Sequence, residues 1–291
     1  PAQVAGVENI VLITPPNSEG KIAPEIIRTA EILGINAIYR IGGAVGIAAL
    51  AYGTQTIPRV DKIVGPGNKY TMAAKKLVYG DVGIESLPGP TETLIIADDW
   101  ADYQHVVADL LAQAEHEGAQ PVLVTTSKSL IDDVKEVIHY QLSHLESADS
   151  STANNAESAK KSLKNGYIVL VHDLEEAIDL ANIYAPEHLC LLCKEPWELL
   201  PEVKNAGGIF LGDHSLEAIG DYIAGPSHVM PTSGTARFSS SINVRDFQKI
   251  IPLVNLNKEV FDELAPAAIR MARREGLEAH ARAIESRLSD D

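Results

Sequence analysis

The sequence has few aromatic residues and few basic ones, and each scarcity limits what the protein can be. Aromatic residues make up 5% of the 291 residues, yet 45% of the chain is hydrophobic, which is enough for one large or two ordinary globular domains. Lys and Arg number 24 against 40 Asp and Glu, so the formal net charge is −16. Because the average surface repels polyanions, nucleic acid and membranes are not expected partners, and an anionic ligand needs a local binding feature.

Long apolar runs, a signal peptide and internal repeats are also absent from the sequence. No stretch of about 18 apolar residues is present. The N-terminal PAQVAGVENIVLITPP lacks the basic stretch and apolar core of a signal peptide, so we expect a cytoplasmic or organellar-stroma protein. The lack of a fixed-period repeat excludes solenoids and propellers.

The only two cysteines, Cys190 and Cys193, lie in HLCLLC. In a strand, the alternation of side chains would point them to opposite faces of the sheet. Because there is no second C-x-x-C pair and no redox context nearby, two buried thiols are a simpler interpretation than a metal or redox site.

Residues 1–90 alternate between strand-like and helix-like patterns. The strand-like runs ENIVLITPP, INAIYRIGG and KIVGPGN alternate with the helix-like segments APEIIRTAEILG, AVGIAALAYGT and KYTMAAKKLVYG. A second cycle begins at TETLIIADD and runs through QPVLVTT to GYIVLVHD. This alternation predicts an α/β fold with two Rossmann-like, doubly wound units.

We expect the first Rossmann-like unit, on the dinucleotide side, at 1–90, and the second, which carries the candidate metal and catalytic motifs, at 91–240. Residues 241–291 are expected to form a small helical extension that either caps its own subunit or reaches a neighbouring one. Three turns in the first unit are rich in Pro and Gly and lie at the carboxyl ends of predicted strands, where ligands of open α/β sheets bind. The polar, Ser- and Asn-rich residues 147–157 are expected to be a surface connection.

Two glycine-rich turns follow predicted strands in the first unit. In GPGNKYT, Gly65 and Gly67 precede a helix, where glycines let a phosphate approach the backbone and the helix N-terminus offers free N–H groups. In IGGAVGIAAL, Gly42 and Gly43 occupy the same kind of position. Neither turn matches G-x-G-x-x-G, so each is either part of a dinucleotide site or a simple tight turn.

Several polar side chains lie in Pro- and Gly-rich segments of the second unit. SLPGPTET places Thr91 at the start of a strand. YAPEHLCLL places Glu187 beside His188, and two neighbouring side chains of different pKa can divide acid and base catalysis. GDYIAGPSHVMPT has the composition of a ligand-facing loop. The alternative for each segment is a solvated surface turn.

The segment LLAQAEHE ends a predicted helix with Gln113 and His116 one turn apart. Its leucines and Ala114 form one apolar stripe, and the two polar side chains lie together at its edge. The ordinary explanation is a solvated helix end, where the helix dipole favours a histidine. Together with Asp221 and one further histidine, these side chains would make an N and O ligand set that zinc accepts. The spacing alone leaves both explanations open.

Taken together, these segments resemble the histidinol dehydrogenase family of NAD-dependent zinc enzymes. The similarity covers the chain in order, through GGAVGIAALAYGT, VGPGNKY, GPTETLIIAD, LLAQAEH, APEHL, IFLGDHSLEAIGDYIAGPSHVMPT and EGLEAH. It implies an oxidoreductase of histidine biosynthesis that converts L-histidinol to the aldehyde and then to L-histidine, using two NAD in succession. It also implies a homodimer with a shared active site.

The resemblance further implies a metal site. One Zn²⁺ per subunit would be bound by Gln113, His116 and Asp221, with His280 supplied by the C-terminal extension of the other subunit. The expected role of zinc is to hold the imidazole and amine of the substrate rather than to polarise the reacting oxygen.

Catalytic and binding roles follow from the same resemblance. His188 would be the general base at the alcohol step, and Glu187 would activate the water that attacks the aldehyde. Asn68 would contact NAD. The positions that match substrate contacts are Thr91, Gln113, His116, His188, Asp221, Tyr222, His228, Glu275 and His280.

Two features depart from the family pattern. Val45 stands where the family has a glutamine that contacts the dinucleotide, and a valine side chain cannot form this hydrogen bond. The chain also matches only about the C-terminal two thirds of the family, without a glycine-rich N-terminal part that lines the cofactor and substrate sites. Two alternatives therefore stay open: a dehydrogenase of another small polar alcohol on the same zinc scaffold, and a truncated zinc-binding homodimer with impaired catalysis.

Overall fold

The computed structural model describes residues 1–146 and 150–288, and the chain divides into two compact units, Pro1–Phe247 and Gln248–Asp291. None of the helices in the described ranges combines the length and the hydropathy needed to cross a membrane. The predicted α/β fold with parallel sheets and a helical C-terminal segment is confirmed. The predicted boundary between 1–90 and 91–240 stays a prediction.

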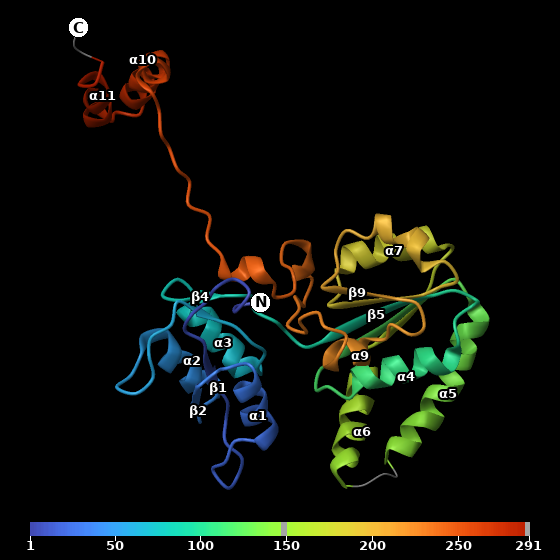
Figure 1. Ribbon diagram of the computed structural model, residues 1–291. Helices are drawn as coiled ribbons and strands as arrows, with labels where there is room; N and C mark the ends of the chain where they lie inside the picture. The colour runs from blue at the N-terminus through green and yellow to red at the C-terminus, as the bar shows by residue number, and fades with distance from the viewer. Residues whose placement is uncertain (147–149, 289–291) are drawn as a thin grey trace. The chain divides into compact units, whose positions relative to one another are not determined.

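A five-stranded parallel sheet lies at the centre of the second half of the larger unit (Figure 1), with the strand order β7-β6-β5-β8-β9. The strands are β5 (Glu92–Ala97), β6 (Gln120–Thr125), β7 (Tyr167–Leu170), β8 (His188–Leu192) and β9 (Gly208–Leu211). Helix α7 (Leu174–Tyr184) covers one face, and α4 (Tyr103–Ala114) with α5 (Lys128–Glu146) covers the other. Because helices cover both faces, β5 is buried along its whole length.

Strand alternation divides the core into two layers. Leu94 and Ile96 pack toward α7, whereas Ile95 packs toward α4 and α5. Cys190 belongs to the α4 layer and Cys193 to the α7 layer, and both are buried free thiols. The predicted placement of the two cysteines on opposite faces is therefore confirmed.

The strands of the first ninety residues are shorter than expected and do not form one sheet. β1 (Val11–Ile13) pairs with β2 (Ala37–Tyr39), and β3 (Lys62–Ile63) pairs separately with β4 (Gly83–Ile84), all in parallel. The helices here are α1 (Pro24–Ile32), α2 (Gly43–Tyr52) and α3 (Lys69–Val78). One physical reason is local: β1 is followed by Pro15 and Pro16, which have no N–H to donate to a longer ladder.

The expected surface connection at 147–157 is wrong where the structure tests it. Helix α6 (Ser150–Leu163) already begins at Ser150, while residues 147–149 lie outside the described residues. Ala156 and Ala159 are buried, so small side chains let α6 pack closely. The Ser162 hydroxyl donates a hydrogen bond of 2.9 Å to the backbone oxygen of His116, which ties α6 to the end of α4.

Shorter elements complete both units. In the larger unit these are α8 (Pro196–Leu199), η1 (Leu200–Glu202), α9 (Glu217–Tyr222), η2 (Thr235–Arg237) and η3 (Val244–Phe247). The smaller unit is a helical hairpin of α10 (Lys258–Arg274) and α11 (Glu278–Glu285). Its core is small, with Ile269, Ala272 and Ala281 buried, and Arg273 pairs with Glu278 across the turn.

A buried ion pair shapes the glycine turn between β3 and α3. Lys75 Nζ lies 2.5 Å from Glu85 Oε1 and 2.8 Å from the backbone oxygen of Gly65. The N–H of Gly65 donates to the same Glu85 oxygen at 2.9 Å. The side chains of Lys75 and Glu85 are 1% and 3% exposed, so neither charge has water as a substitute partner.

Lys75→Met is therefore expected to destabilise the chain by about 3–5 kcal/mol, because it leaves the Glu85 carboxylate buried without a cation. Urea unfolding followed by circular dichroism measures this change. The double variant Lys75→Met/Glu85→Gln should recover much of the loss. A single variant as stable as the wild type would contradict the assigned pair.

Candidate metal and active site

Most of the polar motifs in residues 91–240 meet at the amino edge of the five-stranded sheet. Thr93 is the second residue of β5, and His188 is the first residue of β8. Gln113 lies in the last turn of α4, and Asp221 in the last turn of α9. The predicted position of Thr91 at the start of a strand is confirmed, since β5 begins at the next residue. A helix that follows a parallel strand runs back along the sheet, so its last turn lies at the amino edge.

His188 is a fully buried histidine with one free ring nitrogen. Its Nδ1 lies 3.0 Å from the backbone oxygen of Glu92, which can only accept, so Nδ1 carries the proton. Its Nε2 is buried and has no hydrogen-bond partner among the described residues. Burial lowers the pKa of His188 to about 4, and the hydrogen bond to Glu92 opposes this shift. At neutral pH, His188 is therefore an uncharged base with its lone pair on Nε2.

Glu187 is a buried carboxyl group with an elevated pKa. Its Oε2 accepts hydrogen bonds from the Thr91 hydroxyl at 2.6 Å and from the Glu92 N–H at 3.1 Å. Burial raises the pKa of Glu187 to about 7, and the two hydrogen bonds only partly offset the shift. The group can therefore exchange a proton near neutral pH, as acid–base catalysis requires.

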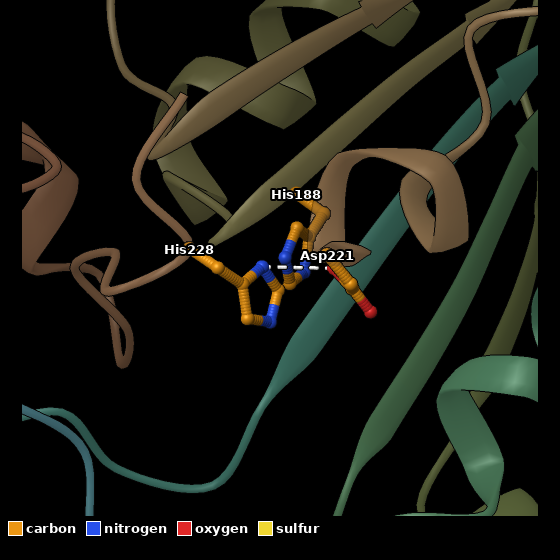
Figure 2. Close-up of side chains that lie close together, drawn as sticks. All are labelled: His188, Asp221 and His228. Carbon is orange, nitrogen blue, oxygen red and sulfur yellow. Dashed lines mark ion pairs between the residues drawn. The ribbon is translucent and has the colours of Figure 1, made fainter. Parts of the chain in front are cut away.

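Asp221 and His228 lie beside His188 (Figure 2). Asp221 Oδ1 is 2.8 Å from His228 Nδ1, in an ion-pair contact without hydrogen-bond geometry. The rings of His188 and His228 stack with centroids 5.4 Å apart and planes inclined by 20°. One ligand atom from each of these three residues lies within 4.8 Å of the others, so this trio could also hold a metal ion.

Gln113 lies in the last turn of α4 and His116 just beyond that helix, and among the described residues the group of His188, Asp221 and His228 does not include His116. Gln113 is fully buried, although it lies at the edge of the predicted apolar stripe. Its Oε1 lies 3.0 Å from the Thr93 hydroxyl, and its Nε2 has no partner in the part of the chain that the structure describes. His116 is exposed; burial raises the pKa of Asp221, and the nearby His228 and His116 only partly oppose this shift. The solvated-face explanation therefore fails for Gln113.

A family model described as histidinol dehydrogenase matches residues 1–288. The chain belongs to the histidinol dehydrogenase family. It is 57% identical over 288 residues to histidinol dehydrogenase of Deinococcus radiodurans, covering 99% of this chain and 65% of that protein. The Thermus thermophilus enzyme is 51% identical, with 99% and 67% covered. The chain thus spans about two thirds of the length of these relatives.

A solved histidinol dehydrogenase structure from Elizabethkingia anophelis has the same fold, with a TM-score of 0.90 and 37% identity. It covers 99% of this chain, which matches 65% of that one. The predicted family is confirmed, and so is the prediction that this chain corresponds to only part of a family member.

The side chains of this site fit a borderline divalent metal. Five buried side-chain atoms among the described residues have no hydrogen-bond partner, and three of them belong to this site: Gln113 Nε2, His188 Nε2 and Asp221 Oδ1. Buried polar atoms are normally paired, so three orphans together indicate a missing partner. An amide, imidazoles and a carboxylate offer the oxygen and nitrogen ligands that zinc binds.

The remaining predicted residues do not belong to this group of side chains. Asn68 caps α3, and its Oδ1 accepts from the N–H groups of Tyr70 and Thr71 at 3.1 Å. Tyr222 is 89% exposed. Glu275 is the C-cap of α10 and His280 lies in α11, both within the smaller unit, and their predicted roles stay predictions.

Sequence reasoning missed two buried residues of the site. Glu217 is 7% exposed and lies one turn before Asp221 on α9, a spacing that places both on one helix face. Thr93 is fully buried and contacts both Glu217 and Gln113. The i,i+4 spacing in LEAIGDY was the available signal for Glu217, whereas no local pattern pointed to Thr93.

Proposed function

We propose that this chain catalyses the NAD-dependent oxidation of L-histidinol to L-histidine at a zinc site. The observation that carries the proposal is the buried, neutral His188, which has a free Nε2 and lies close to Asp221, while its Nδ1 is 3.8 Å from the Glu187 carboxyl group. Membership of the family supports the same reaction. A buried base without a charge suits removal of a proton from an alcohol.

Two residues would divide the proton transfers. His188 Nε2 would accept the hydroxyl proton of the alcohol, while its Nδ1 stays bonded to the oxygen of Glu92. Glu187 would accept a proton from the water that attacks the aldehyde stage, because its pKa of about 7 lets it ionise in neutral solution. Thr91 would hold the Glu187 carboxyl group through its hydroxyl and contact the substrate.

The metal ligands we propose are Gln113, His116 and Asp221, together with His280 of the partner subunit. When bound, zinc would hold the imidazole and amine of the substrate, and NAD would accept the hydrides. Asn68 would contact NAD through its amide nitrogen, since its Oδ1 already caps α3. Val45, 70% exposed at the start of α2, offers no hydrogen bond to the dinucleotide.

A homodimer is the proposed assembly. The segment that begins the smaller unit contains four strongly exposed apolar side chains, Ile250, Ile251, Leu253 and Val254, each at least 83% exposed. Such a run of apolar surface is typical of a protein contact. We propose that a second copy of the chain covers this apolar segment. That copy would also supply His280 of the partner subunit as the fourth metal ligand.

Metal analysis and an NADH assay test the proposal. The purified chain should contain one Zn²⁺ per subunit and form NADH from L-histidinol at alkaline pH, faster than from other small polar alcohols at equal concentration. A sample that contains no zinc and forms no NADH would overturn the proposal. Zinc and a dimer without NAD binding in a calorimetric titration would instead support the impaired zinc-binding homodimer.

A further inference from the structure

The Thr93 hydroxyl lies between two buried side chains that compete for its single proton. Its Oγ1 is 3.0 Å from Gln113 Oε1 and is in close contact with Glu217 Oε2. Thr93 and Gln113 are 0% exposed, and Glu217 is 7% exposed, so water does not mediate these contacts. A hydroxyl has one proton to donate, and it can also accept hydrogen bonds through its lone pairs.

Counting protons leaves two consistent arrangements. In the first, a protonated Glu217 donates to the Thr93 oxygen, the Thr93 hydroxyl donates to the oxygen of Gln113, and the amide nitrogen of Gln113 keeps the unpartnered position. In the second, the hydroxyl donates to an ionised Glu217, and Gln113 turns its amide so that the nitrogen donates to Thr93. The amide oxygen then occupies the unpartnered position. The two ends of an amide have nearly the same size, so this exchange needs no extra space.

Only the second arrangement presents a metal ligand. An amide oxygen has lone pairs for a cation, whereas an amide NH₂ group has only donors. We propose that Glu217 and Thr93 are positioning residues that turn the amide oxygen of Gln113 toward the metal, the carboxylate holding the hydroxyl and the hydroxyl holding the amide nitrogen. This inference rests on the proposed function, in which Gln113 is a zinc ligand.

The surroundings of Glu217 favour this role. Its Oε1 lies 3.6 Å from His188 Nδ1, whose proton is already donated to the Glu92 oxygen. Within the described ranges, no Lys or Arg forms an ion pair with Glu217, and burial raises its pKa to about 8. A buried carboxyl group without a cation is costly, and a bound divalent metal nearby would favour its ionised form. Helix α9 thus carries both the proposed ligand Asp221 and, one turn earlier, the orienting carboxylate.

The test compares zinc affinities of variants of the full chain. Thr93→Val keeps the shape of the side chain but removes the hydroxyl, and it should raise the Zn²⁺ Kd about 10-fold to 100-fold, the usual effect of losing an orienting partner. Thr93→Ser, which restores the hydroxyl, should bind zinc nearly as the wild type does. Chelator competition gives the Kd, and the visible absorption of the Co²⁺-substituted protein should shift in Thr93→Val only.

A double-variant cycle separates this role from a general structural one. Glu217→Gln should also weaken zinc binding, but the Thr93→Val/Glu217→Gln pair should be no weaker than Thr93→Val alone, because Glu217 acts through Thr93. Thr125→Val is the matched control: Thr125 is a fully buried threonine whose oxygen accepts from Ser127 N–H at 3.0 Å, and its loss should leave the Kd unchanged.

Three results would overturn the inference: wild-type affinity in a folded Thr93→Val, additive effects in the cycle, or an equal loss in Thr93→Ser. Each of these leaves the proposed function standing if the wild type binds one zinc per subunit. A wild type that binds no zinc overturns both.

Discussion

His188→Asn is expected to lower turnover of L-histidinol by about 100-fold to 10,000-fold, the usual range for loss of a general base. The Asn side chain can still donate to the Glu92 oxygen, as Nδ1 of His188 does, but it has no equivalent of the free Nε2. Zinc content should stay at the wild-type level, because His188 is not among the proposed ligands. Steady-state NADH formation and metal analysis on the same sample measure both quantities.

The pH dependence separates His188 from Glu187. His188, with a pKa of about 4, is already neutral at pH 6, so it should not limit the rate between pH 6 and 9. Glu187 is ionised only above its pKa of about 7, so oxidation of the aldehyde should rise with pH through that value. Glu187→Gln should remove this rise along with most of the activity.

An exposed histidine outside the site serves as the control for these measurements. His172 is 91% exposed and pairs with Asp173, and His172→Asn should leave turnover unchanged. The assignment of His188 as the base fails if His188→Asn keeps more than a tenth of wild-type turnover, or if it loses zinc and activity in parallel.

His116→Asn is expected to weaken Zn²⁺ binding by roughly 100-fold or more, because one of four proposed ligands is lost from a site whose total binding energy is large. Turnover should fall together with metal content. Dialysis against buffer of fixed free zinc, followed by metal analysis, measures the loss. The control is Glu117→Gln. Glu117 is exposed and directly follows His116, and this variant should retain zinc.

His228→Asn distinguishes the two possible ligand sets. The atoms of His188, Asp221 and His228 lie close enough to bind a metal without His116. If zinc is lost from His228→Asn but kept by His116→Asn, this trio is the metal site and the ligand set predicted from the sequence is wrong. Loss in His116→Asn alone supports Gln113, His116 and Asp221.

The helix that ends in LLAQAEHE illustrates how far local patterns reach. Its periodicity correctly placed Gln113 and His116 in or just beyond the last turn, at the edge of an apolar stripe. The helical periodicity did not indicate that Gln113 is fully buried, because its burial depends on the contact with Thr93 and on the packing of α9 against α4. Burial of a polar side chain is decided by elements that are distant in sequence.

Glu217 shows the same limit more sharply. It lies 124 residues from Thr93 along the chain, yet the two side chains are in contact. Its raised pKa, like that of Glu187, follows mainly from burial. Burial cannot be inferred from the composition or from a sequence motif. Local spacing linked Glu217 to Asp221, but its hydrogen-bond partner depends on the packing of α9 against β5.

The sequence by itself determined the α/β class, the helical C-terminal hairpin, the opposite faces of Cys190 and Cys193, and, through its ordered motifs, the family. These features follow from short-range periodicity and from the order of motifs along the sequence. Tertiary structure alone decided that the first strands form two separate sheets, that α6 begins at Ser150, and that the site lies at the amino edge of the larger sheet. Each of these depends on which surfaces pack together, and the free energy of that packing is a property of the whole chain.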